Sequence, residues 1–334
     1  MKNNTVLLAH GTGGDKSNEL IRLIKKNFNN KILNRMDDAG VAEFSGVKTA
    51  FSTDSFVIDP IFFNGGDIGK LAVCGTVNDI CMMGAKPLFM SVAMIIEEGF
   101  SQKDLLKISQ SIAKTAKEAK ISIITGDTKV VDKGKADKIF INTSAVGLIP
   151  DGINISSVNA SEGDDVIISG NIAEHAAAIM MQRNDFKFKT KIKSDCAHLD
   201  SLVQTMLKEC KEIHVLRDPT RGGLAAALNE ISKSSNKGII INNDEIPVSK
   251  QVRAFCKILG LDPLYMANEG KLVSIQPSKY TAKILNAMRK HPSGKNAKVI
   301  GKIVNDKKNV WIKSKSGILR ILANADVEQY PRIC

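Results

Sequence analysis

The first half of the chain alternates between apolar and polar blocks that predict strands and helices. Residues 46–59 are rich in β-branched and aromatic residues and predict a strand, which Asp54 interrupts. Residues 65–84 carry small and apolar side chains at helical spacing and predict a buried helix. Residues 101–119 predict an amphipathic helix capped by Ser101. Its apolar stripe consists of Leu105, Leu106, Ile108, Ile112 and Ala116.

The same pattern predicts two further strands before the middle of the chain. These are residues 121–125 and 138–149, with a loop at 126–129. Residues 150–152, Pro-Asp-Gly, predict a turn. This turn is the best candidate for a domain boundary.

A new α/β pattern begins after this turn. Residues 164–170 predict a strand, helices and short strands alternate after it, and a last strand pair is expected near 297–314. A length of 334 residues exceeds what one compact core usually serves. We therefore predict an α/β (α+β) protein with domains at 1–150 and 151–321. Residues 322–334 lack a continuing period and predict a mobile tail.

Composition narrows the class of protein. Hydrophobic residues at 43% and charged residues at 25% are typical of a globular chain. No apolar run approaches the roughly 20 residues that span a bilayer, and the N-terminal apolar stretch is too short for a signal peptide. The six cysteines form no CxxC pair, so we expect free thiols. These features predict a cytoplasmic protein without a membrane partner.

The net charge of +12 raises nucleic acid as a partner, but its distribution does not support one. Only 9 of the 47 basic residues are Arg, and aromatic residues make up 5% of the chain. Basic residues are spread among acidic and polar ones, so neither stacking platforms nor Arg forks are gathered. We expect no nucleic-acid partner.

The common nucleotide-binding motifs are absent. Residues 10–17 resemble a P-loop, yet Asp15 stands where a Walker loop needs Gly, and no GxGxxG motif occurs. The backbone amides around Gly11, Gly13 and Gly14 can still approach an anion. A flexible N-terminal turn explains the same glycines equally well.

Four acidic residues interrupt apolar segments: Asp54, Asp79, Asp127 and Asp218. A buried carboxylate must be paired, hydrogen-bonded or metal-bound, because an isolated buried charge is costly. Several together suggest Mg²⁺ bridging to substrate phosphates. For any single one, a helix cap or an ion pair explains it equally well. Asp218 in particular fits an N-cap, because Pro219 suits a first helical turn.

Two further polar motifs lie in the second half. Arg217 and Arg221 in RDPTRGG precede a predicted helix and suit an anion at its N-terminus, although a structural Arg–Asp pair remains an alternative. Asn268, Glu269 and Lys271 in ANEGK form, taken alone, an ordinary polar turn.

The last residue, Cys334, is the most unusual. The thirteen residues from 322 onward reach roughly 40 Å when extended, far enough to enter an active site. A thiol at the end of such a segment can act as the carrier of a covalently bound group. Arg332 favours its thiolate and the terminal carboxylate opposes it.

Together these motifs resemble the HypE family of hydrogenase maturation factors nearly from end to end. The matching segments are HGTGG, STDSFVIDPIFFNGGDIGKLAVCGTVNDICMMGAKP, TGDTKVV, SDCA, LRDPTRGGLAAALNE, LGLDPLYMANEGK and PRIC. Several are shared with aminoimidazole ribonucleotide synthetase and selenophosphate synthetase, whereas the PRIC terminus is typical of HypE. The resemblance implies a two-domain PurM-like fold, an N-terminal sheet that pairs with a second subunit into a dimeric sheet or barrel, and ATP between the domains.

The resemblance also implies the reaction. A HypF-type carbamoyltransferase loads a carbamoyl group onto Cys334, and the resulting thiocarboxamide is dehydrated to a thiocyanate with ATP. The cyanide passes through a HypC–HypD scaffold to the iron of a [NiFe]-hydrogenase. Glu269 is then the candidate base, Lys129 its assistant, and Asn268 orients the amide.

The implied ligands form two sets. ATP contacts are expected from Gly11, Gly13, Gly14, Asp54, Asn78, Asp79, Asp127, Arg217 and Arg221. Magnesium contacts are expected from Asp54, Asp79, Asp127 and Asp218. The chain departs from the family at residues 173–176, where Ala-Glu-His-Ala replaces the common Gly-Asp-His-Gly, so we expect no phosphate contact there.

Two other functions remain open at this point. One is an ATP-dependent phosphotransferase acting on a small molecule, for which Cys334 would be incidental. The other is a non-catalytic carrier that ferries a group on its terminal thiol. Loss of function on deletion of Cys334 distinguishes the first from the predicted reaction, and binding of ATP with Mg²⁺ distinguishes the second.

Overall fold

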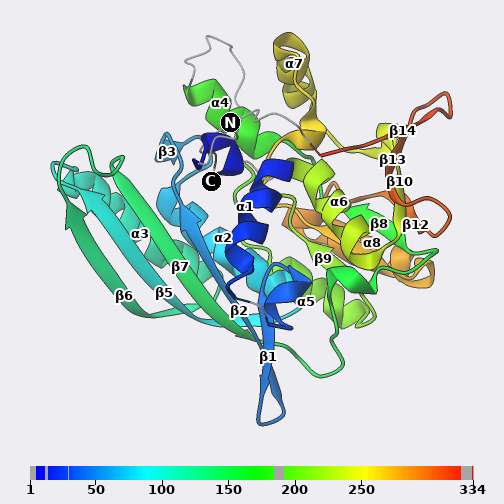
Figure 1. The fold of residues 1–334 in the computed structure, drawn as a ribbon, viewed down its shortest axis with the longest axis horizontal. Coiled ribbons are helices and arrows are strands. Elements are labelled where there is room, and N and C mark those ends of the chain that lie inside the picture. The colour runs from blue at the N-terminus through cyan, green and yellow to red at the C-terminus, as the bar shows by residue number, and fades with distance from the viewer. Residues whose placement is uncertain (1–4, 12–13, 29, 184–191, 325–332, 334) are drawn as a thin grey trace.

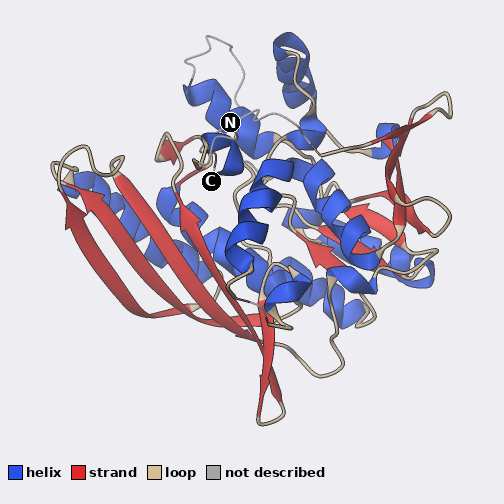
Figure 2. Cartoon of the chain, in the orientation of Figure 1, coloured by secondary structure: helices blue, strands red, loops and turns tan. Residues whose placement is uncertain are grey.

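The structure is a computed structural model that describes residues 5–11, 14–28, 30–183, 192–324 and 333. Two sheets lie on opposite sides of the molecule, and helices fill the space between them (Figures 1 and 2). The helices are α1 (Asp15–Lys25), α2 (Ile68–Met82), α3 (Gln102–Glu118), α4 (Glu174–Arg183), α5 (Asp200–Glu209), α6 (Gly223–Ser235), α7 (Lys250–Leu259) and α8 (Ser278–Lys290). The fold is mixed α/β, as predicted.

The strands are β1 (Gly40–Phe44), β2 (Val47–Phe56), β3 (Phe62–Phe63), β4 (Gly66–Asp67), β5 (Lys86–Glu97), β6 (Ser122–Val131), β7 (Ile139–Leu148), β8 (Asp165–Ile168), β9 (Val215–Arg217), β10 (Gly238–Asn242), β11 (Val273–Gln276), β12 (Lys298–Val304), β13 (Asn309–Lys313) and β14 (Leu319–Ile321). Short 3-10 turns include η1 (Leu8–Gly11), η2 (Leu33–Arg35) and η3 (Ser157–Asn159).

The first sheet has the strand order β1-β2-β7-β5-β6. Its neighbours pair antiparallel except β5 and β6, which run parallel. Alternation along β2 turns Ala50, Ser52 and Phe56 inward, where α2 packs against β2 and β7. The helices α2 and α3 cover one face of this sheet (Figure 1).

The predicted buried helix is confirmed as α2. Nearly all of its side chains are buried, because it lies between the sheet and the helices α3 and α5. The helix begins at Ile68, since the Asp67 carboxylate accepts hydrogen bonds from the amides of Gly69 and Lys70 at 2.8 and 3.1 Å. The core of the first domain therefore centres on α2.

The predicted amphipathic helix is confirmed as α3, with one residue misplaced. The Ser101 hydroxyl caps it by accepting a hydrogen bond from the Asp104 amide. Ile108, Ile112 and Ala116 are buried. Leu106 was expected in the same stripe but is exposed, because it follows Leu105 by one residue and therefore points about 100° away around the helix.

The predicted loop at residues 126–129 is wrong, since β6 continues through it to Val131. A Cβ on Gly126 would lie 2.5 Å from the carbonyl oxygen of Val92 on β5. This glycine therefore allows two strands to approach closely and does not mark a turn.

The second sheet has the order β14-β13-β10-β12-β8-β11-β9. The strands expected near 297–314 exist as β12 and β13, but the prediction that they pair is wrong. Both instead flank β10, β12 antiparallel and β13 parallel. Because β8 and β11 are buried along their whole length, this sheet forms the core of the second domain.

The described parts of segment 322–334 are held by the rest of the molecule. Leu322 is buried and its amide donates to the carbonyl of Val310, while the Asn324 side chain donates to Asp15 of α1. Ile333 is buried as well. Residues 325–332 and Cys334 lie outside the described residues.

Candidate functional site

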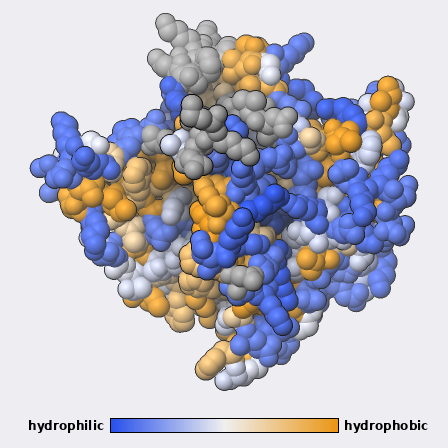
Figure 3. Space-filling model, in the orientation of Figure 1, coloured by the Kyte–Doolittle hydropathy of each residue, from blue (hydrophilic) through white to orange (hydrophobic). Residues whose placement is uncertain are grey.

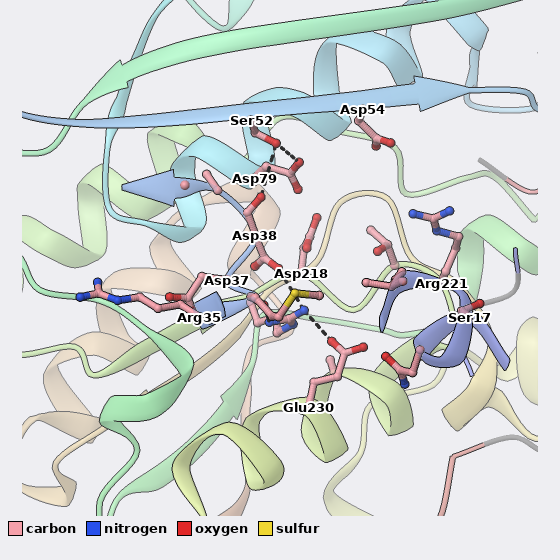
Figure 4. Close-up of a pocket in the computed structure, with 18 of the residues that line it drawn as sticks. Ser17, Arg35, Asp37, Asp38, Ser52, Asp54, Asp79, Asp218, Arg221 and Glu230 are labelled. Atoms are coloured by element: carbon pink, nitrogen blue, oxygen red, sulfur yellow. Dashed lines mark hydrogen bonds and ion pairs between the residues drawn. The ribbon is translucent and has the colours of Figure 1, made fainter. Parts of the chain in front are cut away.

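A cavity of about 880 Å³ lies where β2, α1 and α2 meet the second domain. Five of its lining residues come from four parts of the chain: Ser52 and Asp54 from β2, Asp79 from α2, Asp218 from the loop after β9, and Glu269 from the loop before β11. Figure 4 shows Asp38, Asp54, Asp79 and Asp218 around one space, below strand β2. The structure therefore brings together three of the four predicted metal ligands and the candidate base.

Regular elements position the two acids of the first domain. Asp54 follows Ser52 by two residues on β2, so both side chains lie on the face that packs on α2. Asp79 lies in the last turns of α2 and accepts a hydrogen bond of 2.6 Å from the Ser52 hydroxyl. A Cβ at Gly75, one turn earlier, would meet the Phe56 ring at 2.8 Å and the Asp54 carboxylate at 3.7 Å. Close packing of β2 on α2 thus fixes this pair.

Burial dominates the electrostatics of these carboxyl groups. It raises the pKa of Asp38 to about 6 and raises the pKa of Asp54, Asp79 and Asp218. Neighbouring carboxylates raise the pKa of Asp38, Asp79 and Asp218 further, whereas the Arg221 charge lowers the pKa of Asp54. We call these four residues with Glu269 the acidic cluster. A cation bound beside it would relieve both the desolvation and the repulsion.

Glu269 is the most isolated member of the acidic cluster. Burial raises its pKa well above the usual range, and the charges of Cys196, Asp218, Asp195 and Asp54 act in the same direction. Its Oε1 is buried without a hydrogen-bond partner. Such an atom is costly in a finished core but is suited to a ligand that brings a donor.

No three His, Cys, Asp or Glu residues within the described ranges are already grouped to hold a metal ion. Mg²⁺ commonly keeps several waters and takes one or two protein carboxylates plus substrate phosphates. Asp54, Asp79 and Asp218 are the residues here that suit such a role.

Arg217 is committed to neighbouring acids. Its guanidinium contacts Asp38 at 3.4 Å and Glu230 at 2.5 Å, and it also donates to the carbonyl of Met36. Although burial acts to lower the pKa of Arg217, the charges of Asp38 and Glu230 outweigh this effect and raise it. The geometry is the structural Arg–Asp pair that the sequence left open. Arg221 is exposed on the cavity wall instead, where its charge acts on Asp54.

The alternative explanation of Asp218 as a helix cap does not hold. Helix α6 begins at Gly223 with Gly222 as its N-cap, four residues after Asp218. Asp218 is buried at the cavity instead. Gly222 adopts a φ of 76°, a left-handed conformation that favours glycine, and this turn separates Asp218 from the helix.

Asn78 and Asn268 hold loops and do not line the cavity. Asn78 donates to the carbonyl of Ala197 at 3.1 Å and accepts from the amide of Leu199 at 2.8 Å. Asn268 is fully buried and accepts from the amide of Ala173 at 2.7 Å. It also donates to the carbonyls of Pro219 and Met266. Both side chains are thus satisfied by backbone.

Asp127 and Lys129 lie apart from the acidic cluster. Both are exposed on β6, an edge strand, with the Lys129 ammonium 2.7 Å from the Asp127 carboxylate. The hydrogen bond from Lys129 lowers the pKa of Asp127. Within one chain, neither residue lines the cavity.

The remaining predicted residues either flank a segment that the structure does not describe or lie outside the described residues. Gly11 ends the turn η1, next to His10 of the cavity wall, and Gly14 is the N-cap of α1. Gly13 and Cys334 lie outside the described residues. The described cysteines are free, as expected, and all five are buried: Cys74, Cys81, Cys196, Cys210 and Cys256.

Asp37 and Asp38 also belong to this region, although neither was predicted from the sequence. Asp38 is buried beside Arg217, and Asp37 accepts hydrogen bonds from the Ser156 hydroxyl at 2.6 Å and the Ser157 amide at 2.9 Å. The signal was an acidic pair directly ahead of the apolar segment AGVAEF. It resembles an ordinary surface turn, and the partners that bury it lie far along the chain.

Comparison with protein families matches both halves of the chain. Residues 36–149 match the N-terminal domain of AIR synthase related proteins, and residues 161–313 match the C-terminal domain of the same proteins. The boundary between the two matches contains the predicted turn at 150–152. No described helix is long and apolar enough to cross a membrane.

Full-length relatives carry a more specific name. The chain is 45% identical to the carbamoyl dehydratase HypE of Cupriavidus necator, over all of this chain and 96% of the relative. It is similar to HypE in a crystal structure of a HypE–HypF complex, with a TM-score of 0.88, 47% identity, and coverage of 92% and 99% of the two chains. It is also similar to HypE crystallised in complex with ATP, with a TM-score of 0.84, 42% identity, and coverage of 99% and 100%.

Proposed function

Because the chain belongs to the HypE family of carbamoyl dehydratases, which act in hydrogenase maturation, we propose that it dehydrates a thiocarboxamide on Cys334 to a thiocyanate. The observation that carries this proposal is the acidic cluster between the domains. It combines carboxylates suited to cation and phosphate binding with a buried, unpartnered glutamate. Phosphoryl activation and proton removal are the two tasks that this dehydration requires.

The proposed reaction removes one water from the carbamoyl group in two stages. Oxide is a poor leaving group, so the carbamoyl oxygen first takes the γ-phosphoryl group of ATP, and ADP leaves. The nitrogen then loses two protons, the carbon–oxygen bond breaks, and phosphate departs with the oxygen. The products are thiocyanate, ADP and phosphate. This chain must hold the phosphates, orient the amide and accept the protons.

We assign the phosphate end of the cavity to Asp54, Asp79 and Asp218, with Arg221 on its wall. Magnesium would be held by these carboxylates and would neutralise charge on the transferred phosphoryl group. Burial disfavours their ionised forms, so a cation should bind there with release of protons. His10 of η1 lines the cavity and Gly11 follows it in the chain, so we propose that backbone amides of this turn contact phosphate.

We assign proton removal to Glu269. Its raised pKa makes its carboxylate a stronger base than an exposed glutamate. Its Oε1 has no hydrogen-bond partner and can therefore accept a hydrogen bond from an N–H group of the substrate. Asn268 acts indirectly in this proposal. Its amide fixes the Ala173 backbone and the loop that carries Glu269, so it positions the base and does not contact the substrate.

We propose that Asp127 and Lys129 act across a homodimer interface. Strand β6 is an uncovered edge whose side chains are nearly all exposed. The sheet face opposite the helices is also apolar: Phe51, Val146 and Phe89 lie in register, and the two phenylalanines are 53% and 47% exposed. Apolar atoms gather over this part of the molecule (Figure 3). A second copy would cover this surface and bring its Lys129 to the neighbouring cavity.

One relative supports a partner for this chain. A HypE–HypF complex has been crystallised, and we propose a HypF-type carbamoyltransferase as the donor to Cys334. A HypC–HypD scaffold is the proposed acceptor of the cyanide. The cytoplasmic location stays a prediction.

Intact-mass spectrometry tests the proposal. The chain is incubated with a HypF-type enzyme, carbamoyl phosphate and ATP, and the nucleotide products are quantified. We expect an added carbamoyl mass that falls by one water, with one ADP formed per water lost. A chain lacking Cys334 should form neither adduct nor coupled ADP. ATP turnover on a small molecule that survives this deletion would indicate a phosphotransferase instead.

A further inference from the structure

The residue before the terminal cysteine occupies a built site in the fold. Ile333 is 5% exposed and belongs to the hydrophobic core. Its carbonyl oxygen lies 2.8 Å from Nε2 of His175, which is completely buried at the start of α4. No step of the proposed dehydration has used His175, and the two residues are far apart in sequence.

The hydrogen bonds around His175 define which nitrogen carries the proton. Its Nδ1 lies 2.7 Å from the Ser194 hydroxyl, and the same hydroxyl oxygen accepts the Cys196 amide at 3.0 Å. A carbonyl oxygen can only accept, so Nε2 facing Ile333 carries the ring proton, and Nδ1 of the neutral ring accepts a hydrogen bond from the Ser194 hydroxyl. Burial lowers the pKa of His175, which favours this neutral form. The ring is thus set to donate to the Ile333 carbonyl.

The segment that orients His175 also holds Glu269. The Asp195 carboxylate accepts a hydrogen bond of 3.2 Å from the Glu269 amide, and the Ala197 amide donates to the Glu269 carbonyl at 3.2 Å. A Cβ at Gly270 would lie 1.9 Å from the Asp195 carbonyl oxygen, so this contact requires a glycine. Residues 194–197 are therefore a short bridge between the site of Ile333 and the candidate base.

The loop before His175 is held in a strained conformation. Ala173 has a φ of 70°, in the left-handed region that disfavours a side chain. Its amide donates to the buried Asn268 side chain at 2.7 Å, which links this loop to the residue before Glu269. Strain retained by specific contacts is typical of functional positions.

We propose that His175 is a latch that docks the end of the chain, by binding the Ile333 carbonyl, on the bridge that carries Glu269. The inference rests on the proposed function, since docking would present the Cys334 adduct to its base. Covalent geometry keeps the Cα atoms of residues 333 and 334 about 3.8 Å apart. Breaking this hydrogen bond would weaken the docking of Ile333, which burial of its side chain also stabilises, and would favour release of the end of the chain. His175 is therefore a positioning residue.

Alkylation of Cys334 by iodoacetamide tests the latch without ATP or a carbamoyl donor. The described cysteines are buried, so the terminal thiol should react first. His175→Asn keeps a polar atom near Ser194 but is too short to reach Ile333, whereas His175→Gln can place an amide N–H near the position of Nε2. We expect His175→Asn to raise the alkylation rate about fivefold, the ratio that corresponds to about 1 kcal/mol for a net hydrogen bond. His175→Gln should restore a rate near that of the parent chain.

Equal alkylation rates in the parent, His175→Asn and His175→Gln chains would overturn the latch. If the Asn variant does not fold, ¹⁵N NMR of the parent chain replaces it. Removing Ile333 and Cys334 should then change the Nε2 resonance of His175, and an unchanged resonance would also overturn the proposal.

The dehydration rate separates the latch from the proposed function. Carbamoylated His175→Asn should lose water about fivefold more slowly than the parent chain, while its loading by a HypF-type enzyme is unimpaired. If the parent chain shows the latch in alkylation but never loses water with ATP, the proposed function fails and the latch stands.

Discussion

Aspartates in two regions of this chain have pKa values that are shifted in opposite directions from the usual value. In the acidic cluster, burial raises the pKa of Asp54, Asp79 and Asp218, and neighbouring carboxylates raise the pKa of Asp79 and Asp218 further. On the exposed edge strand β6, the hydrogen bond from Lys129 lowers the pKa of Asp127. The sequence placed all four aspartates in one metal set, but the structure divides them between two environments.

This difference separates two kinds of functional residue. The acidic cluster is assembled within one chain at the expense of folded-state stability, and it gains most from a bound cation. The pair on β6 costs the monomer little, and it becomes useful only if another molecule covers it. We therefore expect changes in the acidic cluster to alter function and stability in opposite directions, and changes on β6 to alter function alone.

The largest effect is expected from Asp79→Asn. It should slow ATP-dependent dehydration at least a hundredfold, because one of the carboxylates proposed to hold Mg²⁺ beside the phosphates is lost. It should also stabilise the nucleotide-free protein by about 1 kcal/mol near pH 7, since a buried charge beside like charges is removed. Single-turnover mass spectrometry and chemical denaturation measure the two effects. Asp306→Asn, on an exposed turn, is the matched control and should change neither. A slow variant that is also less stable would contradict the trade-off.

The next effect concerns Lys129. Lys129→Ala should slow dehydration roughly tenfold or more, as expected for loss of a charged group at a reacting centre. The midpoint of chemical denaturation of the separated monomer should stay unchanged, because the side chain is exposed within one chain. Lys114→Ala, another exposed lysine paired with an acid, is the control.

Mixed dimers show whether Lys129 acts in its own chain or in the partner. Mixing Lys129→Ala with Glu269→Gln should restore activity if each cavity takes its lysine from the other copy, since one intact site forms per mixed dimer. Without restoration, the assignment of Lys129 across the interface is incorrect.

A smaller effect is expected on the pH dependence of stability. A carboxyl group whose folded-state pKa is raised binds more protons in the folded than in the unfolded protein, so stability falls as pH rises between the two values. For Asp38 this window runs from about 4 to about 6. We expect a loss on the order of 1–3 kcal/mol across it for the nucleotide-free protein. In Asp38→Asn the slope should be smaller. Urea denaturation from pH 4 to 7 measures it, and stability that rises throughout this range would contradict the electrostatics of the cluster.

Local patterns in the sequence predicted the elements that are themselves locally determined. The spacing of apolar residues identified α2 and α3, and acids within apolar segments identified Asp54, Asp79 and Asp218. The predicted loop on β6 was wrong because Gly126 looks like a turn residue, whereas it serves contact with another strand.

Properties that depend on distant partners were not predictable in this way. Asp38 becomes a candidate site residue only because the fold places it beside Arg217, which also contacts Glu230. Both partners lie far along the chain from Asp38. The role of His175 likewise depends on Ser194 and on Ile333, which the fold brings to opposite sides of its ring. Such sites are defined by contacts between segments, and a single sequence contains no direct signal for them.

The most direct test of the central claim is a single turnover of the Glu269→Gln chain. The variant is carbamoylated at Cys334 by a HypF-type enzyme, mixed with ATP and Mg²⁺, and followed by intact-mass spectrometry beside the parent chain and Glu245→Gln, a substitution outside the cavity. The parent and Glu245→Gln should lose one water from the adduct, while Glu269→Gln should accumulate the carbamoylated form. Loss of water from Glu269→Gln at the parent rate would contradict a role for the acidic cluster's glutamate as the base of this reaction.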